Sequence, residues 1–498
     1  MTAPVQEPVV MPEPPASRST RNMAHPVTAF AAALVLGLAS SFTHAQLPGT
    51  PDPDFGIGGR IIHDFHDAND RANAIVPLKD GRFLTAGYVV GPNISGPGSS
   101  PNFVVARFLS SGLPDPSFGN NGHFELDIGG GVDAAHDLTV LPDRSIVAVG
   151  NLSPQFHADA AIVKLTPDGE LDTTFGRPDG LGGRTGWNIV DLGGSTIHDD
   201  GIAVAMQRDG RLIVAARTLR PAGPFHYHRV AVMRFTTDGQ LDPTFGASHD
   251  GIVVLDHFAG EQQSDYLTAI ALDQRGRLPG NDSVTVVGYT ASANNAFIAR
   301  LTADGELDPT FGTGGRRTLQ WSVSGGVHSG LNTITGARVL PDGRLALVGT
   351  AGDRGFTFMR LAANGAIDTT FGSNGRTTIK FSDPSRNDEP AALALQGNGR
   401  LVAAGYAING ASGTPQKDFF VARVNADGTP DASFGDGQAR VIVSLAHPTD
   451  EAHAVAVEPS GRILAGGYVE QSGNQDFAIL GLAGDPDRIG WYDFELPR

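Results

Sequence analysis

Short apolar runs, each bounded by glycine, aspartate or asparagine, cover most of the chain beyond residue 45. Phe-Val-Val-Ala-Arg-Phe at residues 103–108 is a typical run, and Ala-His-Ala-Val-Ala-Val at residues 452–457 is another. Runs of this length between turn residues indicate strands, and no longer stretch carries the periodicity of an amphipathic helix. The pattern therefore predicts an all-β protein.

Many of these runs are joined by tight turns. Asp-Gly-Arg stands at residues 80–82, 209–211 and 342–344, and Asn-Gly-Arg stands at residues 398–400. Asp-Gly or Asn-Gly between two apolar runs is typical of a β-hairpin, because a primed turn needs positive φ. Together with the runs before and after the hairpin, each unit supplies four short antiparallel strands.

A Phe-Gly pair recurs within the signature Leu-Asp-x-x-Phe-Gly-x-x-Gly, at intervals of about 60 residues, and such a period is typical of one supersecondary unit repeated in a ring or a stack. Because each unit holds four strands, the sequence predicts a seven-bladed β-propeller of four-stranded antiparallel blades. We expect the phenylalanine of each signature to wedge between blades. These residues are Phe55, Phe118, Phe175, Phe245, Phe311, Phe371 and Phe434.

The two ends of the repeat array complement each other. The first outer run, residues 60–65, has no unit before it, and the last apolar run, residues 477–482, has no Phe-Gly signature after it. We predict that these runs pair and close the seventh blade, which removes two open sheet edges. The alanine-rich run of each unit is expected to be innermost, since the crowded axis of a propeller favours small side chains.

Three spaced motifs, Asp-Gly-Arg-apolar, Val-Ala-Arg-Leu and Leu-Asp-x-x-Phe-Gly-x-x-Gly, together resemble the delta-60 repeat family of bacterial proteins. The resemblance covers residues 47 to about 482. It implies a β-propeller-like repeat protein, often exported, and it brings no established reaction. The chain departs from the pattern at an insertion in residues 177–183, at extra residues 278–282, and at Gly481, where other copies have Arg or Lys.

The N-terminus has the pattern of a signal peptide over residues 1–45. Arg18 and Arg21 precede an apolar run at residues 27–42, and the small residues that follow end at Ala45. We predict cleavage after about Ala45. The apolar run is too short for a membrane span, so the sequence predicts a secreted or periplasmic cell-envelope protein, not an integral membrane protein.

This segment also sets the expected domain limits. The propeller should occupy residues 46–498, with a C-terminal tail at residues 483–498. The start codon stays open between Met1 and Met23, although the arginine pair would be lost from the shorter chain.

Composition narrows the classes of partner. The formal net charge is −17, which disfavours nucleic acid and anionic membranes. The chain has no cysteine, which excludes disulfides and thiolate metal sites. We expect a monomer with a protein or polysaccharide partner.

A first candidate site is a ring of carboxylates at the start of the presumed inner strands. In a closed ring they would circle one mouth of the channel, where oxygen ligands could attract Ca²⁺ or another hard cation. The alternative is that each aspartate caps its own loop or accepts a hydrogen bond from a backbone N–H of a neighbouring blade. His136, His198 and His453 lie near the ring and could bind a metal or act as a base. The ring positions are Asp70, Asp133, Asp199, Asp265, Asn332, Asp388 and Asp450.

A second candidate is a repeated basic–acidic pairing, for which we expect a structural role because an Arg–carboxylate pair fixes geometry. A base near the end of the fourth run is followed eight residues later by the signature aspartate, as in Arg107 and Asp115. The last copy has Gly481 in place of the base and no signature after it, so both partners of the pair are absent together. A structural ion pair would leave such a joint absence. The bases are Arg107, Lys164, Arg234, Arg300, Arg360 and Arg423.

The loops that do not repeat are the predicted place of function. Residues 91–101, 221–228, 409–417 and 471–475 vary in length on a rigid scaffold, where binding usually occurs. We therefore favour a non-enzymatic binding or scaffold module for a surface glycan or a protein partner, with no cofactor other than Ca²⁺. The alternatives are a hydrolase or lyase acting on a polymer at the channel mouth, and a purely structural surface protein.

Overall fold

The computed structural model describes residues 46–485 with short gaps. The residues not described inside that range are 93–98, 154–156, 195–197, 223, 256, 259, 261, 277–281, 292–294, 320–332, 353, 382–387, 410–415, 436, 446–448 and 472. The predicted signal peptide, Asn332, and the tail after Asp485 lie outside the described residues.

Every regular element in the described residues is a β-strand, and the strands form seven antiparallel sheets of four. We number these sheets as blades, and give each from its innermost to its outermost strand. Blade 1 is β2 (Asp70–Pro77), β3 (Phe83–Pro92), β4 (Ser99–Phe108) and β5 (His123–Leu126); blade 2 is β6 (Ala134–Val140), β7 (Ile146–Leu152), β8 (Asp159–Leu165) and β9 (Trp187–Val190); blade 3 is β10 (Asp200–Met206), β11 (Leu212–Ala222), β12 (Phe225–Phe235) and β13 (Ile252–Leu255); blade 4 is β14 (Asp265–Asp273), β15 (Ser283–Thr290), β16 (Ala296–Leu301) and β17 (Arg316–Leu319); blade 5 is β18 (Thr333–Val339), β19 (Leu345–Thr350), β20 (Phe356–Leu361) and β21 (Arg376–Ile379); blade 6 is β22 (Glu389–Leu395), β23 (Leu401–Asn409), β24 (Gln416–Val424) and β25 (Arg440–Val443); blade 7 is β26 (Asp450–Val457), β27 (Ile463–Gln471), β28 (Asn474–Leu482) and β1 (Arg60–His63).

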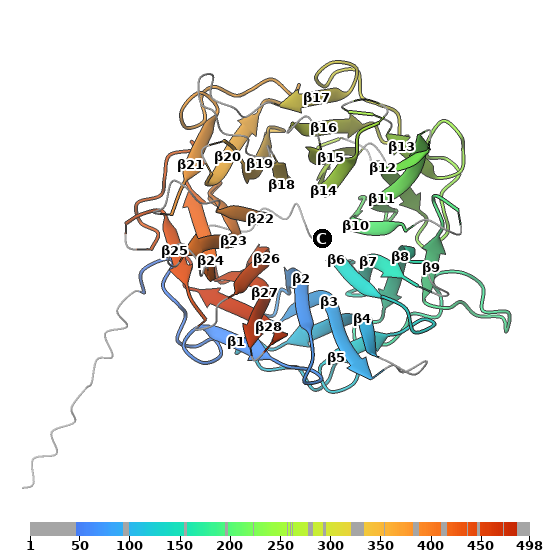
Figure 1. The fold of residues 1–498 in the computed structure, drawn as a ribbon, viewed down its shortest axis with the longest axis horizontal. Coiled ribbons are helices and arrows are strands. Elements are labelled where there is room, and N and C mark those ends of the chain that lie inside the picture. The colour runs from blue at the N-terminus through green and yellow to red at the C-terminus, as the bar shows by residue number, and fades with distance from the viewer. Residues whose placement is uncertain are drawn as a thin grey trace, which may run out of the picture. The chain divides into compact units, whose positions relative to one another are not determined.

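The blades form a ring, which confirms the predicted seven-bladed propeller. Figure 1 shows the first strand of each blade, β2, β6, β10, β14, β18, β22 and β26, around the centre. These are the alanine-rich runs of the sequence, as expected from the limited space at the axis.

The ring closes as the two ends of the repeat array predicted. Strand β1 pairs antiparallel with β28, with Arg60 opposite Leu480 and His63 opposite Phe477. The paired segment ends at His63, two residues earlier than the run expected at 60–65, because the chain turns into the loop that leads to β2. The N-terminal strand is thus the outer edge of the last blade.

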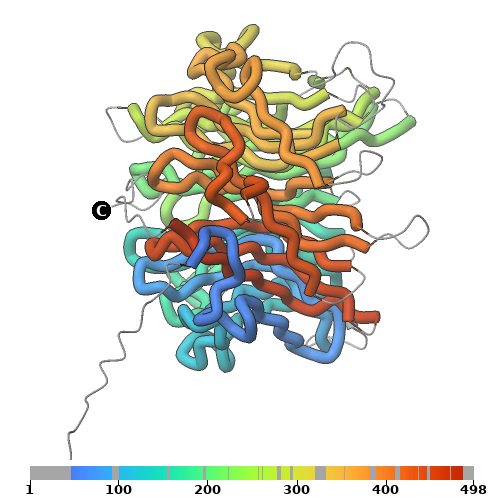
Figure 2. Tube along the Cα trace, turned by 90° about the vertical axis from the view of Figure 1, so that its left-hand side faces the viewer, coloured from blue at the N-terminus to red at the C-terminus, as the bar shows by residue number. Residues whose placement is uncertain are grey.

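The ring has two chemically different ends. The inner hairpin turns and the Phe-Gly signatures share one end, which we call the turn end. The connections between second and third strands, and those between one blade and the next, share the other end, which we call the loop end. Figure 2 shows the strands running between these two ends.

All four loops predicted at this end are shorter than expected, because the strands on either side extend into them, and the clearest case lies between β11 and β12. Phe225 to His228 belong to β12, whose pairing with β11 continues to Ala222 opposite Phe225. The hairpin extends beyond the blade core as a two-stranded ribbon, so these residues are exposed or half-buried although they are paired in a strand. Phe225 at the tip is 61% exposed.

Separate apolar cores lie between neighbouring blades, and the signature phenylalanines are part of them. All seven are at most 1% exposed. Beside each phenylalanine, the backbone N–H of the signature glycine donates to a carbonyl of the next blade, as from Gly312 N to Asn364 O at 2.9 Å and from Gly56 N to Ser111 O at 2.8 Å. The signature is therefore a seam between blades.

The described part of the chain contains no helix with the length and hydrophobicity needed to span a membrane.

Candidate functional site

The six aspartates of the predicted ring are buried, and each one caps the loop that precedes its strand. Their exposed fractions are 0 to 4%. This geometry agrees with the loop-capping alternative, and ligand binding by these residues stays a prediction. In each case Oδ2 accepts a backbone N–H at 2.6–3.2 Å: Phe65 to Asp70, Ile128 to Asp133, Leu192 to Asp199, Phe258 to Asp265, Phe381 to Asp388 and Leu445 to Asp450.

Burial raises the pKa of these carboxyl groups, because the charged form loses its hydration. The pKa of Asp70 and Asp450 is raised to about 7, and that of Asp133 and Asp388 to about 6. The backbone hydrogen bonds favour the charged form and lower the pKa, but burial is the larger cause. These groups therefore take up protons near neutral pH and couple stability to pH.

The repeated basic–acidic pairs lie at the turn end and have the geometry of a structural element. Arg107 also donates from Nη1 to Pro167 O in blade 2 at 2.6 Å and lies 4.7 Å from the ring centroid of Phe118. One cation thus joins the signature carboxylate, the wedge phenylalanine and the next blade. The pairs, at N–O distances of 2.7–2.8 Å, are Arg107–Asp115, Lys164–Asp172, Arg234–Asp242, Arg300–Asp308, Arg360–Asp368 and Arg423–Asp431.

A second arginine at these pairs was missed by the sequence analysis. The arginine of the inner hairpin turn reaches the same carboxylate, as Arg82 Nη1 reaches Asp115 Oδ2 at 3.0 Å and Arg211 Nη1 reaches Asp242 Oδ2 at 3.0 Å. The arginine of the Asp-Gly-Arg motif therefore holds the signature carboxylate of its blade, in addition to its place in the hairpin turn.

The last copy lacks the strand base, with Gly481 at that position as the sequence indicated, but it takes its signature from the other end of the chain. Ring closure brings Asp52 and Phe55, from the start of the chain, to blade 7. A Cβ at Gly481 would lie 2.6 Å from Cδ1 of Phe55, so the ring of Phe55 occupies the place where other blades hold Arg. Arg462 supplies the cation instead, with Nε 3.3 Å from Asp52 Oδ2.

Two of the predicted histidine ligands occupy β-bulges. Every inner strand has one bulge, and a bulge re-aims the side chain of its extra residue. His136 Nε2 lies 3.2 Å from Asn151 Oδ1, whereas Arg71 Nη2, in blade 1, lies 3.0 Å from His453 Nδ1. The bulge residues are Asn73, His136, Ile202, Thr268, Thr335, Ala391 and His453.

His198 is in neither of these environments. It lies before β10, and its Nδ1 accepts the N–H of Ala158 at 3.2 Å. Within the described residues, His136, His198 and His453 make separate contacts and form no common ligand set.

The non-repeating side chains gather just beside the capping aspartates. The residue after each capping position pairs across the strands with a residue of the second strand, and together with His136 and His453 these pairs make up what we call the mouth belt. Aspartate precedes the pair in six blades, but the pair itself varies around the ring, with Glu–Tyr shared by blades 6 and 7. The pairs are Arg71–Tyr88, Ala134–Asn151, Asp200–Arg217, Tyr266–Tyr289, Thr333–Thr350, Glu389–Tyr406 and Glu451–Tyr468.

The belt is continuous across the closure between blades 7 and 1. The guanidinium of Arg71 lies 5.3 Å from the ring centroid of Tyr468, and the ring of His453 stacks on Tyr468 at 5.6 Å. Burial, with the charges of Arg71 and Lys417, lowers the pKa of His453 well below its usual range. The imidazole is therefore neutral at physiological pH.

Blades 6 and 7 share a second part of the belt. Lys417 Nζ lies 2.6 Å from Glu451 Oε1 and 4.2 Å from the ring centroid of Tyr406. Burial, followed by a hydrogen bond to Glu389, raises the pKa of Tyr406, so that its hydroxyl stays protonated. This region therefore holds the half-buried ring of Tyr406 and the buried ring of Tyr468 among paired charges.

Blades 3 and 4 extend the aromatic surface. The ring centroids of Tyr266 and Tyr289 lie 5.1 Å apart, and His228 of β12 lies 4.8 Å from Tyr266. Burial and Tyr266 raise the pKa of Tyr289, and the charge of Glu389 in blade 6 adds to this.

One signal in the sequence could have revealed the mouth belt. The chain has seven tyrosines, and five of them, Tyr88, Tyr266, Tyr289, Tyr406 and Tyr468, are belt members. All five lie on inner or second strands beside the capping position, not in the variable loops. An alignment of the seven repeats would place each of these tyrosines either in the column of the residue after the capping position or in the column of the residue that pairs with it on the second strand.

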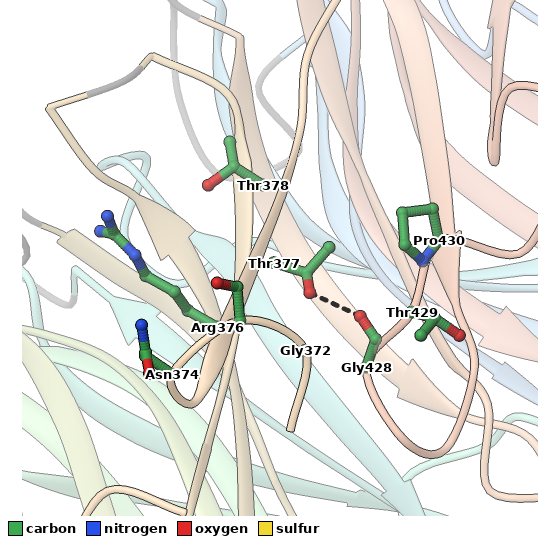
Figure 3. A pocket seen from close by; sticks show the side chains of 9 residues that line it. Gly372, Asn374, Arg376, Thr377, Thr378, Gly428, Thr429 and Pro430 are labelled. Atoms are coloured by element: carbon green, nitrogen blue, oxygen red, sulfur yellow. Dashed lines mark hydrogen bonds between the residues drawn. The ribbon is translucent and has the colours of Figure 1, made fainter. Parts of the chain in front are cut away.

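A separate cavity of about 600 Å³ lies at the turn end between blades 5 and 6 (Figure 3). Its walls include Arg376, Thr377 and Gly428, and Thr377 Oγ1 donates to the carbonyl of Gly428. The lining consists of a signature loop and the adjoining turn of the next blade. This is the seam found between all blades, so we assign the cavity a structural origin.

Five segments of the chain match a family described as "Domain of unknown function (DUF5122) beta-propeller". The chain is a β-propeller repeat protein. Each match begins near the inner hairpin turn and ends at a signature phenylalanine, so it covers the second and third strands of one blade. The matched residues are 141–175, 207–245, 281–311, 340–371 and 396–434.

Comparisons with individual proteins add little to this. No curated protein sequence matches the chain. Among solved structures, Sqt1 from Chaetomium thermophilum is 13% identical with a TM-score of 0.39, covering 85% of this chain and 100% of its own. A luciferin-regenerating enzyme is 9% identical with a TM-score of 0.33, covering 78% of this chain and 96% of its own. At such TM-scores these likenesses carry no argument.

Proposed function

We propose that this propeller is a non-enzymatic binding module whose mouth belt recognises a glycan of the cell surface. The observation that carries the proposal is the contrast between the two ends of the ring. The turn end repeats one arrangement of a cation, an aspartate and a phenylalanine, whereas the loop end gathers residue pairs that vary around the ring, with Glu–Tyr shared by blades 6 and 7. A rigid scaffold with variable residues at one end is the usual form of a binding surface.

The chemistry of the mouth belt suits a carbohydrate. Tyrosine offers an apolar ring face and a polar hydroxyl, and sugar rings likewise combine C–H faces with hydroxyl groups. Tyr266 and Tyr289 lie face to face at an interplanar angle of 24°, and Tyr406 and Tyr468 each lie beside a glutamate on the paired strand. Glutamate and arginine side chains can accept and donate hydrogen bonds to hydroxyls.

The cellular setting follows from the N-terminal pattern and the resemblance to the delta-60 repeat family. We propose that residues 1–45 direct export and that the propeller acts in the envelope or outside the cell. Propeller closure between β1 and β28 lies beyond Ala45, so removal of the segment would leave the ring intact.

The Ca²⁺ prediction is tested separately by thermal melts with EDTA and with added Ca²⁺.

A glycan array followed by calorimetric titration of the best-bound glycan tests the main proposal. Tyr266→Ala and Tyr406→Ala should each weaken binding at least tenfold. Trp187→Ala, on the outermost strand β9, is the matched aromatic control and should leave affinity unchanged. Binding of no glycan, or equal affinity in the belt variants, would overturn the glycan assignment; capture of a protein at the same mouth would replace it with the protein partner.

A hydrolase or lyase at the same mouth is the second candidate. The observation in its favour is the neutral His453 next to Arg71, with Glu451 Oε2 3.7 Å from its Nε2. Polymer cleavage by the full chain, lost in His453→Gln while the glycan still binds, would establish this alternative. Binding without cleavage of the same glycan would support the non-enzymatic module.

A further inference from the structure

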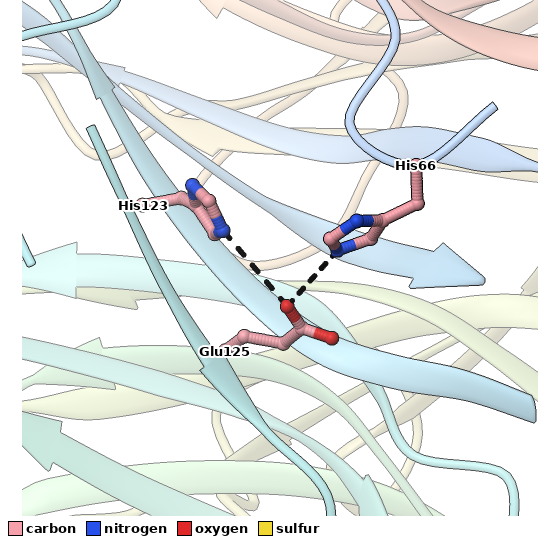
Figure 4. A group of neighbouring side chains, drawn as sticks. All are labelled: His66, His123 and Glu125. Atoms are coloured by element: carbon pink, nitrogen blue, oxygen red, sulfur yellow. Dashed lines mark hydrogen bonds and ion pairs between the residues drawn. The ribbon is translucent and has the colours of Figure 1, made fainter. Parts of the chain in front are cut away.

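Three metal-ligating side chains meet at the junction of blades 7 and 1, outside the mouth belt. His66 lies in the loop that links β1 of blade 7 to β2 of blade 1, and His123 and Glu125 lie on β5, the outermost strand of blade 1. Residues two apart on a strand project from the same face. Figure 4 shows the two imidazoles turned toward the Glu125 carboxylate.

The distances are close to those of a ligand set. His66 Nε2 lies 3.1 Å and His123 Nε2 lies 3.8 Å from the same oxygen, Oε2 of Glu125. One ligand atom from each residue falls within 4.8 Å of the others. Ligands about 2.0–2.2 Å from a tetrahedral Zn²⁺ are separated by roughly 3–3.6 Å. Small side-chain rotations would therefore complete the site.

The surroundings hold the ligands in place. Asn102, fully buried on β4, donates from Nδ2 to Glu125 Oε1 at 2.6 Å, which orients the carboxylate and leaves Oε2 toward the histidines. Such an outer hydrogen bond is a regular feature of metal sites. The ring of Phe65 packs edge-on to His123 at 5.0 Å.

The site is also accessible. The His66 side chain is 28% exposed, whereas those of His123 and Glu125 are 16% and 12% exposed. An ion could enter from the His66 side, and a position on that side would stay open to water or to an outside ligand.

We propose that His66, His123 and Glu125 bind one divalent transition-metal ion of the Zn²⁺ class. Two imidazole nitrogens and one carboxylate suit Zn²⁺ and related ions and do not suit Ca²⁺, which takes oxygen ligands. The ion would join the segment after the closing strand β1 to the outer edge of blade 1. Its binding therefore stabilises the place where the ring is closed.

Calorimetric titration of the metal-free full chain with Zn²⁺, paired with a thermal melt, tests the proposal. We expect one saturable Zn²⁺ site per chain and a melting temperature that rises with Zn²⁺ concentration, since an ion that binds only the native state stabilises it. Ca²⁺ at this site should give neither effect. Co²⁺ should give the absorption bands of a site with nitrogen and oxygen ligands.

Variants decide whether these residues are the ligands. His66→Ala and Glu125→Gln should each weaken Zn²⁺ binding at least tenfold and remove the rise in melting temperature, while circular dichroism shows the fold intact. His226→Ala, an exposed histidine on β12, is the matched control and should bind as the parent does. The proposal is overturned if the parent binds no Zn²⁺, Co²⁺ or Ni²⁺, or if His66→Ala and Glu125→Gln bind Zn²⁺ as tightly as the parent.

Discussion

Arg462 and Asp52 form an ion pair across the closure of the ring, with Nε 3.3 Å from Oδ2. The same arginine lies 5.2 Å from the ring centroid of Phe55. In the other blades the strand arginine or lysine makes these contacts, with help from the hairpin arginine in several. In blade 7 the hairpin arginine alone performs both roles, because Phe55 occupies the space beside Gly481.

Arg234 should be among the most sensitive positions of the turn end. It is 1% exposed, pairs with Asp242 at 2.7 Å, and donates to the carbonyl of Ala303 in blade 4. Arg234→Ala leaves Asp242 with Arg211 as its remaining cationic partner and removes the hydrogen bond to Ala303, so it should lower the free energy of unfolding by about 1–3 kcal/mol. Urea denaturation measures this loss.

The chain supplies two controls for that prediction. Arg234→Lys should lose much less, since Lys164 fills the equivalent place in blade 2 at 2.8 Å from Asp172. Asp80→Ala breaks an exposed pair with Arg82 and should cost at most about 1 kcal/mol. Equal losses of unfolding free energy in Arg234→Ala and Asp80→Ala would contradict the larger stabilising contribution that we expect from the buried pair.

The closure between β1 and β28 predicts a stabilising disulfide. Ile62 lies opposite Ala478 in the antiparallel pair, and opposite residues have Cα atoms about 4.5–5.5 Å apart, within the range of a disulfide. The chain has no native cysteine to compete. A variant with Ile62→Cys and Ala478→Cys should melt at a higher temperature when oxidised than when reduced, because the bond closes a very long loop.

The reduced double variant and the single variant Ile62→Cys are the controls for this effect. Neither should gain stability on oxidation. Failure of the two cysteines to join, in a chain that is otherwise folded, would count against the observed register of β1 on β28.

The sequence was sufficient to predict the architecture because the same pattern of strands and turns occurs seven times along the chain. Phe311 and its counterparts, the hairpin turns and the unmatched terminal runs predicted the blades and their closure. The mouth belt could not be predicted in the same way. Its members, such as Arg71 and His453, are neighbours only because blade 7 meets blade 1, and a bulge that the sequence does not mark re-aims His453.

The metal-ligand cluster shows the same limit. His123 and Glu125 stand two residues apart, but His66 joins them only through the path of the loop after β1. The side-chain distances that make a ligand set depend on the twist of the outer strand. Spacing along the chain carries no record of that twist.

The loop-capping aspartates predict that stability falls as pH rises toward neutrality. Burial raises the folded-state pKa of Asp450 to about 7 and that of Asp388 to about 6, both above the ordinary value of 3.8. The folded state therefore binds more protons than the unfolded state between these values and pH 4. The stabilisation is fully present below the unfolded pKa and is lost as pH rises through 6 to 7.

Other carboxylates set the acid side of this profile. The hydrogen bonds from Thr244 and Arg211 and the charge of Arg234 outweigh burial and lower the pKa of Asp242 to about 2. Its contribution is present above the unfolded pKa and is lost as pH falls through 2. Melting temperature should therefore be highest near pH 4–5, and lower at pH 8.

Asp450→Asn isolates the contribution of one cap. Asparagine keeps an acceptor for the N–H of Leu445 and has no charge to bury. The variant should match the parent at pH 5 and melt at a higher temperature than the parent at pH 8. A parent whose melting temperature does not change from pH 5 to pH 8, or a variant that loses stability at both, would contradict the raised pKa.

The turn glycine Gly305 gives the most direct test of the seam between blades. It has φ of +86°, and an added Cβ would lie 2.9 Å from the backbone N of Gly246 and from the ring of Phe245. Gly305→Ala should therefore both strain its own backbone and separate blades 3 and 4. Gly180, at φ +78° with nothing within 4 Å of the added Cβ, is a matched control that adds only the backbone strain. We expect Gly180→Ala to cost about 1–2 kcal/mol and Gly305→Ala to cost clearly more. Denaturant titration of both variants measures the difference, and equal losses would show that the close approach of the turn to the Phe-Gly pair contributes nothing to the joining of blades.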